Sequence, residues 1–212
     1  ILGMTELVLG GPLTPHQREH LSVVKESGES LVTVINDILD FSKIEAGKYD
    51  VAAEAFDLYE SLGGMMKFLS VRAHEKSLEI AYRILPGTPR RVVGDSARLR
   101  QIIVNLVGNA IQHTPEGGRV RVVLTPSAGA IELRVQDSGP GVAPERRSKV
   151  FERFFREGSS QGAGLGLSIV ARIVELHGGR IALHDSPLGG LEVRVSLPQA
   201  RPTTNATHTA AR

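Results

Sequence analysis

Three side-chain amides at regular spacing are the first residues in this sequence that could carry out chemistry. In the segment RLRQIIVNLVGNAIQHT, Gln101, Asn105 and Asn109 recur every four residues, so they share one face of the expected helix. The segment is apolar on nearly all other sides, and we expect this helix to be buried. An unsatisfied buried amide costs about 1–3 kcal/mol. The amides therefore either line a polar ligand or satisfy one another as an internal ladder, and the spacing leaves both alternatives open.

An acidic residue followed by glycines forms the second candidate segment. VQDSGPGV places Asp137 at the end of an expected strand, before Gly139 and Gly141. A carboxylate there can accept a hydrogen bond from an exocyclic amine, and the glycines let a planar base approach the backbone closely. An ordinary Asp-x-Gly-x-Gly turn without a ligand is the alternative.

A third segment, QGAGLGLSIV, places Gly162, Gly164 and Gly166 at the start of a helix. Free backbone N–H groups and the positive end of the helix dipole favour phosphate at such a position. No Lys-Ser or Lys-Thr follows the glycines, which excludes a P-loop. The glycines also do not join the first strand and helix of a parallel βαβ unit, which excludes a dinucleotide fingerprint.

In this order the segments resemble those of sensor histidine kinases, within the gyrase, chaperone, kinase and mismatch-repair ATPase superfamily. The resemblance runs from Ile1 to about Leu197 and rests on four ordered boxes. They are NLVGNAIQHT at 105–114, DSGPGV at 137–142, VFERFFR at 150–156 and GAGLGL at 162–167. The resemblance implies a site for ATP and Mg²⁺, and transfer of the γ-phosphoryl group to a histidine.

The resemblance also implies roles for single residues. Asn109 matches the asparagine that holds the metal, and Asp137 matches the acid that binds adenine. Asn105 stands where hydrolytic members carry a glutamate that activates water, so its amide favours phosphoryl transfer over hydrolysis. Arg156 is placed to reach the terminal phosphates, with Arg153 as a competing candidate. We take Asn105 and Arg156 as the catalytic residues.

The nucleotide-binding set implied in this way contains ten residues, and alternatives stay open for one of them, His113, and for its neighbour Gln112. His113 either stacks near the nucleotide or is an ordinary histidine at a helix end. Gln112 stands where the family often has lysine, which puts a phosphate contact there in doubt. The full set is Asn105, Asn109, His113, Asp137, Gly139, Gly141, Gly162, Gly164, Leu165 and Gly166.

Residues 151–163 correspond to the mobile lid of the family. Within it we interpret Phe151 and Phe154 as packing anchors rather than as catalytic residues. The segment from Glu157 to Gln161 is short, so few residues are available to close over a nucleotide.

The elements that must position these residues indicate an α+β fold. We expect an N-terminal αα-hairpin, half of a dimeric four-helix bundle, followed by an α/β-sandwich domain that binds ATP. The boundaries we predict are 1–48 for the hairpin, 49–198 for the catalytic domain and 199–212 for a disordered tail. Helices are expected near 58–76, 96–114 and 165–177, and strands near 78–84, 91–93, 119–125, 131–137, 180–184 and 191–197, in a mixed or antiparallel sheet.

The hairpin is expected to dimerise through a broad apolar stripe. Its second helix runs from about Pro15 to Ala46, with Thr14 as the N-cap. Two helices cannot cover such a stripe alone, so pairing with a second copy is our prediction. Packing of the hairpin on its own C-terminal domain is the alternative. The stripe consists of Leu21, Val24, Gly28, Leu31, Ile35 and Ile38, widened by Val34, Phe41 and Ile44.

The phosphoacceptor histidine that the family requires is missing from the printed sequence. In relatives it lies in a His-Glu-x-x-Thr-Pro run, and this sequence starts at ILGMTELVL, just beyond that run. His16 and His20 lack the motif, and we interpret them as surface histidines. We therefore expect the chain to bind Mg·ATP without phosphorylating itself. The alternatives are a nucleotide-binding dimerisation and regulatory module, and a hydrolytic ATPase of the same superfamily.

Composition limits the partners of the chain. The formal charge of +2 comes from nearly balanced acids and bases without long runs of one sign, so we expect no nucleic-acid partner. Zero cysteines exclude disulfides. No apolar run is long enough for a bilayer, so we expect no membrane contact in this segment and a cytoplasmic location, with a parent protein that can be membrane-anchored. The expected partners are a second copy of the chain and a response-regulator receiver domain.

Overall fold

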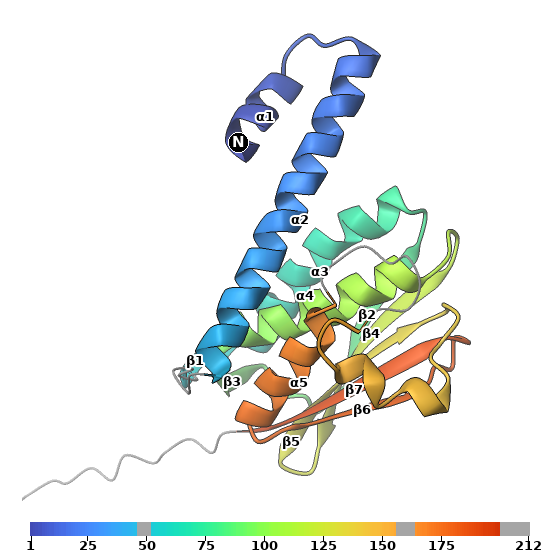
Figure 1. The fold of residues 1–212 in the computed structure, drawn as a ribbon. Coiled ribbons are helices and arrows are strands. Elements are labelled where there is room, and N and C mark those ends of the chain that lie inside the picture. The colour runs from blue at the N-terminus through green and yellow to red at the C-terminus, as the bar shows by residue number, and fades with distance from the viewer. Residues whose placement is uncertain (46–51, 156–163, 200–212) are drawn as a thin grey trace, which may run out of the picture. The chain divides into compact units, whose positions relative to one another are not determined.

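The computed structural model describes residues 1–45, 52–155 and 164–199 (Figure 1). The chain divides into two compact units. The first consists of residues 1–49 and 149–169, and the second of residues 50–148 and 170–212. Among the described helices, none combines the length and the apolar character that a membrane span requires.

The first unit contains the predicted αα-hairpin. Helix α1 spans Leu2–Leu9 and helix α2 spans Pro15–Glu45. Thr14 caps α2 as predicted: its Oγ1 accepts the N–H of Gln17 at 3.3 Å, and Gln17 Oε1 accepts the N–H of Thr14 at 3.0 Å. This reciprocal pair is a capping box with glutamine at its third position. Arg18 donates to the carbonyl of Leu9 at 2.8 Å and so caps the end of α1.

Close packing between α1 and α2 involves a glycine. A Cβ at Gly28 would lie 2.7 Å from the Cδ2 atom of Leu2, so a larger residue there would require the Leu2 side chain to shift. Lys25 and Glu6 form an ion pair across the two helices at 3.0 Å. The glycine that we placed in the apolar stripe is therefore an internal contact of the hairpin.

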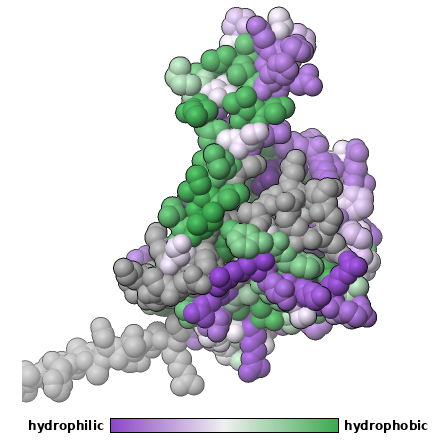
Figure 2. All heavy atoms as spheres, viewed as in Figure 1, coloured by the Kyte–Doolittle hydropathy of each residue, from purple (hydrophilic) through white to green (hydrophobic). Residues whose placement is uncertain are grey.

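Apolar side chains gather along α2 on the visible surface (Figure 2). Leu31 is 59% exposed and Ile38 is 48% exposed. Val23, Val24, Val32, Ile35 and Leu39 are exposed to a comparable extent. Such a row is larger than the scattered apolar residues of ordinary surfaces, and the four-helix bundle that would cover it stays a prediction.

The second unit is built on a five-stranded sheet with the order β2-β4-β5-β7-β6. The strands are β2 (Glu79–Ile84), β4 (Arg119–Ser127), β5 (Ala130–Asp137), β6 (Arg180–Asp185) and β7 (Leu191–Pro198). β2 pairs in parallel with β4, and the other neighbours are antiparallel. The mixed sheet is one of the two arrangements we expected. A separate two-stranded ribbon joins β1 (Glu54–Asp57) to β3 (Arg91–Gly94), and β1 was not anticipated.

Helices α3 (Leu58–Glu75) and α4 (Ser96–His113) pack on the sheet, and α5 spans Gly166–Leu176. Asp57 caps α3 by accepting two backbone N–H groups at 2.9 Å, and Asp95 caps α4 through the N–H of Arg98 at 3.0 Å. Apolar side chains from the helices and the sheet form the core between them. Its members in the second unit include Leu58, Leu62, Leu69, Ile102, Ile103, Leu106, Val107, Leu124, Leu133, Ile173 and Val195.

Two sequence predictions need correction. Helix α4 is not buried all round: Gln101, Asn105 and Asn109 are half-buried, because the sheet and α3 cover only the opposite, apolar face. The predicted tail does not begin at Gln199. The N–H of Gln199 donates to the carbonyl of Gly129 at 2.9 Å, so the hydrogen bonding to β5 continues one residue beyond the end of β7. The remainder of the predicted tail, 200–212, lies outside the described residues.

Candidate functional site

Asp137 ends strand β5 and is 7% exposed. Its Oδ1 atom accepts two backbone N–H groups, from Gly139 at 2.8 Å and from Leu191 at 3.1 Å. No hydrogen bond from the described residues reaches its Oδ2 atom. One carboxylate oxygen is therefore fixed by the backbone, and the other remains available to a donor on a ligand.

The surroundings of Asp137 affect its charge. Burial raises the pKa of this carboxyl above its usual value, while the two backbone N–H groups and the charge of His113 act in the opposite direction. A partly desolvated carboxylate forms stronger hydrogen bonds than one in water. A ligand donor at Oδ2 would therefore contribute both binding energy and orientation.

The glycines after Asp137 are required by close backbone approaches. A Cβ at Gly139 would lie 2.8 Å from the carbonyl oxygen of His113, at the end of α4. Gly141 has a φ of +71°, which disfavours any other residue, and it faces Gly190. The segment 137–141 thus brings the end of β5 against the end of α4.

Sequence reasoning missed Gly190, which ends the turn between β6 and β7, and Leu191, which begins β7. Gly190 donates its N–H to the carbonyl of Asp137 at 3.1 Å. A Cβ at Gly190 would overlap Asp137 Oδ1 and would lie 2.5 Å from the nitrogen of Gly139. The adjacent glycines 189 and 190 were a visible turn signal. The sequence held no sign that this turn meets Asp137, 54 positions before Leu191.

On α4, the structure disfavours the internal ladder of amides. The Asn105 Nδ2 atom is buried and has no hydrogen-bond partner among the described residues. Gln101 Oε1 instead accepts from Arg98 at 2.8 Å. An unpaired buried donor usually indicates a ligand or water site, so the alternative in which these amides face a polar ligand is favoured.

Lys76, which the sequence did not single out, holds the end of α4. Its Nζ atom donates to the carbonyls of Ile111 at 2.9 Å and Gln112 at 2.7 Å. A cation is favourable at the negative end of a helix dipole, where carbonyls lack helical partners. The side chains of Gln112 and His113 themselves are exposed.

The glycine loop before α5 belongs to the first unit. Gly164 has a φ of +68°, its carbonyl accepts the N–H of Phe154 at 3.0 Å, and a Cβ there would lie 2.9 Å from the carbonyl carbon of Phe154. Leu165 is 3% exposed, and Gly166 begins α5. This local geometry requires glycine at position 164.

Our interpretation of Phe154 as a packing anchor is wrong. Its side chain is 67% exposed, because its backbone takes a left-handed conformation with a φ of +60° and turns the ring outward. Phe151 is half-buried. Arg153, the competing arginine, is exposed. Arg156, Gly162 and the segment 157–161 lie outside the described residues.

The structure therefore brings part of the expected set together within the second unit. The ends of α4 and β5 meet where the carbonyl of His113 abuts Gly139, which places His113 beside Asp137, Gly139 and Gly141. Asn105 and Asn109 lie on α4, about two turns and one turn before His113. Gly164, Leu165 and Gly166 lie in the first unit.

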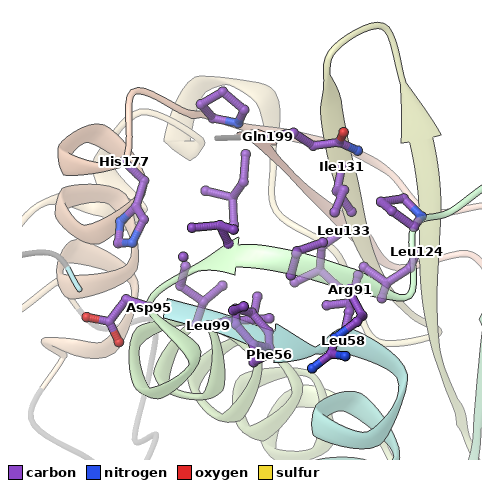
Figure 3. A pocket seen from close by; sticks show the side chains of 18 residues that line it. Phe56, Leu58, Arg91, Asp95, Leu99, Leu124, Ile131, Leu133, His177 and Gln199 are labelled. Carbon is purple, nitrogen blue, oxygen red and sulfur yellow. The ribbon is translucent and has the colours of Figure 1, made fainter. Parts of the chain in front are cut away.

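A cavity of about 300 Å³ lies elsewhere in the second unit (Figure 3). Phe56, Leu99, Ile131 and Leu133 line it, together with His177 at the end of α5. Ile131 lies near the start of β5 and Asp137 ends it, which separates the two by roughly 20 Å at about 3.3 Å per residue. The lining is too apolar for a triphosphate, so this cavity is distinct from the site at Asp137.

Comparison with known families gives two matches. Residues 94–201 match the family described as "Histidine kinase-, DNA gyrase B-, and HSP90-like ATPase". Residues 1–47 match the "His Kinase A (phospho-acceptor) domain". The first match covers just over half of the chain and contains α4, the end of β5 and the glycine loop.

Curated relatives include two named kinases. The chain is 38% identical over 200 residues to the signal transduction histidine-protein kinase BarA of Escherichia coli (strain K12), covering 90% of this chain and 22% of BarA. It is 39% identical over 212 residues to the sensor protein GacS of Pseudomonas syringae pv. syringae, covering 95% of this chain and 23% of GacS. The chain thus spans less than a quarter of the length of these relatives.

Solved structures with a similar fold include full-length ShkA in complex with AMPPNP. The match has a TM-score of 0.79 and 35% identity, and it covers 94% of this chain and 42% of ShkA. The mycobacterial sensor histidine kinase MprB matches with a TM-score of 0.60 and 36% identity, over 69% of this chain and 97% of the MprB chain.

Proposed function

Since this chain belongs to the family of histidine kinase-, DNA gyrase B- and HSP90-like ATPases, we propose that Asp137 binds the adenine of ATP. The single observation that carries this proposal is the unequal use of the two oxygens of Asp137. Gly139 and Leu191 occupy Oδ1 through their N–H groups, and Oδ2 is left to accept a hydrogen bond from the exocyclic amine of adenine. Gly139 lets the loop lie against the carbonyl of His113 while its N–H stays on Oδ1.

Mg²⁺ is the second part of the proposal. The described residues contain no group of three His, Cys, Asp or Glu side chains that could hold a metal. A magnesium ion here would depend on an amide oxygen, phosphate oxygens and water, which are ligands that it accepts. Asn109 offers that oxygen from the half-buried face of α4. Bound Mg²⁺ would neutralise charge on the phosphates, and Asn109 would orient it.

Asn105 supports transfer rather than hydrolysis. Its buried Nδ2 atom is a donor without a partner among the described residues, so it can bind a phosphate oxygen or an ordered water. An amide cannot take a proton from water as a glutamate can. The family match also makes Arg156 and the glycines at 162–166 candidates for phosphate binding.

Within a longer protein, the γ-phosphoryl group would pass to a histidine. The bond between the γ-phosphorus and the bridging oxygen breaks, a phosphorus–nitrogen bond forms at the imidazole, and ADP leaves. The His Kinase A match and the exposed apolar row on α2 support homodimerisation through the hairpin. A response-regulator receiver domain would be the next acceptor, in the cytoplasm.

Incubation with γ-labelled ATP and Mg²⁺ tests this function. The chain is mixed with a separate polypeptide that carries a His-Glu-x-x-Thr-Pro hairpin from a relative. We expect acid-labile label on that polypeptide and none on this chain, and loss of the label with Asn109→Ala. Acid-labile label on this chain alone would refute the proposed division of roles. Steady phosphate release without label would favour the hydrolytic alternative.

A further inference from the structure

A carboxylate is buried on the face of the sheet opposite the one that α3 and α4 cover. Glu192 in β7 is 2% exposed. Its neighbour Val193 is a buried core residue, and because side chains alternate along a strand, Glu192 points to the other face. Buried ion pairs are often replaceable by apolar residues without loss of stability, so stability alone is a weak reason for a carboxylate here.

Both oxygens of Glu192 are engaged. Oε2 accepts a hydrogen bond from Gln136 Nε2, and Oε1 accepts one from Arg194 Nε. Burial by itself would raise the pKa of Glu192, but the hydrogen bonds from Gln136 and Arg194 outweigh it and hold the pKa below its usual value. Glu192 is therefore a paired carboxylate linked directly to β5.

The hydrogen bond between Gln136 and Glu192 lies next to Asp137 along the strands, on the opposite face of the sheet. Gln136 and Glu192 form the last paired rung of the β5–β7 ladder. The next residues, Asp137 and Leu191, point to the opposite face, where the N–H of Leu191 donates to Asp137 Oδ1 at 3.1 Å. The ends of β5 and β7 are thus joined twice. The Gln136–Glu192 hydrogen bond joins them on one face of the sheet, and the Leu191–Asp137 hydrogen bond joins them on the other.

We propose that Gln136 and Glu192 are positioning residues that fix the spacing between β5 and β7 and thereby hold Asp137 Oδ2 where it selects adenine. The inference rests on the proposed role of Asp137 and adds the residues that set its specificity. If the link is removed, the end of β7 can move away from β5. The N–H of Leu191 then no longer holds Oδ1, and Oδ2 loses its fixed direction.

The sheet provides a matched control and a conservative variant. Glu132 pairs with Arg134 on the same face of β5, but it lies four positions before Gln136, away from the site. Glu192→Gln keeps one oxygen for Arg194. Its amide group can donate to Gln136 Oε1, which is buried and has no partner among the described residues. Glu192→Leu removes both bonds at similar volume.

The test compares Mg·ATP with Mg·ITP, whose base carries an oxygen in place of the exocyclic amine. Dissociation constants are measured by calorimetry for the wild-type chain, Glu192→Leu, Glu192→Gln and Glu132→Leu, with thermal unfolding as a check of the fold. We expect Glu192→Leu to lower the preference for ATP by about threefold or more. Glu192→Gln and Glu132→Leu should keep the wild-type preference.

Loss of the preference in Glu192→Leu with rescue in Glu192→Gln supports the inference. A wild-type preference in Glu192→Leu, or equal weakening of both nucleotides, overturns it, because a purely structural role would not distinguish the two bases. If Glu192→Leu does not fold, the double variant Gln136→Leu with Glu192→Leu leaves no unpaired amide and gives the same comparison. A wild-type chain that binds both nucleotides equally overturns the base-binding role of Asp137 itself.

Discussion

Replacing the carboxylate of Asp137 by an amide should reverse the chemistry of the proposed base site while leaving the fold intact. In Asp137→Asn the side-chain oxygen can still accept the N–H groups of Gly139 and Leu191, which lie 2.8 and 3.1 Å from Oδ1. The amide nitrogen must then occupy the place of Oδ2. Two donors, this amide and the exocyclic amine of adenine, would face each other.

The expected loss of ATP affinity follows from one hydrogen bond, the one between Asp137 Oδ2 and the exocyclic amine of adenine. A hydrogen bond to a charged group contributes about 1.5–3 kcal/mol, so the affinity for ATP should fall about 10- to 100-fold. ITP presents an acceptor at the same position, so the variant should bind ITP more tightly than the wild-type chain does. The preference for ATP over ITP should narrow or reverse.

Although Asp137→Asn should weaken ATP binding, it should not lower the stability of the protein without nucleotide. The pKa of Asp137 is raised in the folded state because burial disfavours its charged form. Its contribution to stability is therefore present at acidic pH and is lost as the pH rises through the folded-state pKa. At neutral pH Asp137→Asn removes a buried charge, and its melting temperature without nucleotide should equal or exceed that of the wild-type chain.

Calorimetric titration with both nucleotides and thermal unfolding without nucleotide measure these effects. Glu54→Gln is the matched control, since it removes one exposed negative charge on β1, which pairs with Gly94 at the other end of α4 from His113. If Asp137→Asn binds ATP as tightly as the wild-type chain, the assignment of Oδ2 to the adenine amine is wrong. A large drop in the melting temperature would mean that the variant loses the fold rather than the contact.

Two further predictions concern the turn at the site and the hairpin. Gly190→Ala should lower the melting temperature and weaken ATP binding, since its Cβ overlaps Asp137 Oδ1 and overpacking costs about 1–3 kcal/mol. Gly64→Ala is the control, because it adds the same methyl group in α3 at a position with open space and no positive φ. Equal effects of the two variants would contradict the steric argument. Thr14→Ala should destabilise the start of α2 by about 1 kcal/mol, because it removes the side-chain acceptor for the Gln17 N–H. Urea unfolding followed by circular dichroism measures that loss of stability. Thr14→Ser should keep the wild-type stability, because serine retains the hydroxyl acceptor.

Local elements followed from the sequence because their causes are local. Thr14 with Gln17 sets the start of α2, and the boundaries of β4 and β5 follow from the turn between them. The hydrogen bond from Gln199 to Gly129 was missed because it closes across strands that are distant in the sequence. β1 escaped notice because a strand of four residues carries too little alternation to be recognised.

The candidate site also combines features that are local in the sequence with features that depend on tertiary pairing. The sequence by itself determined which residues could bind a nucleotide, since Asn105, Asn109 and Asp137 are defined by residue type and spacing along single elements. The tertiary structure decided how Asp137 is held. Leu191 and Glu192 reach the end of β5 only because β7 pairs beside it, and Lys76 reaches the end of α4 from the loop after α3. Such pairings depend on the summed packing of whole elements, which no short segment encodes.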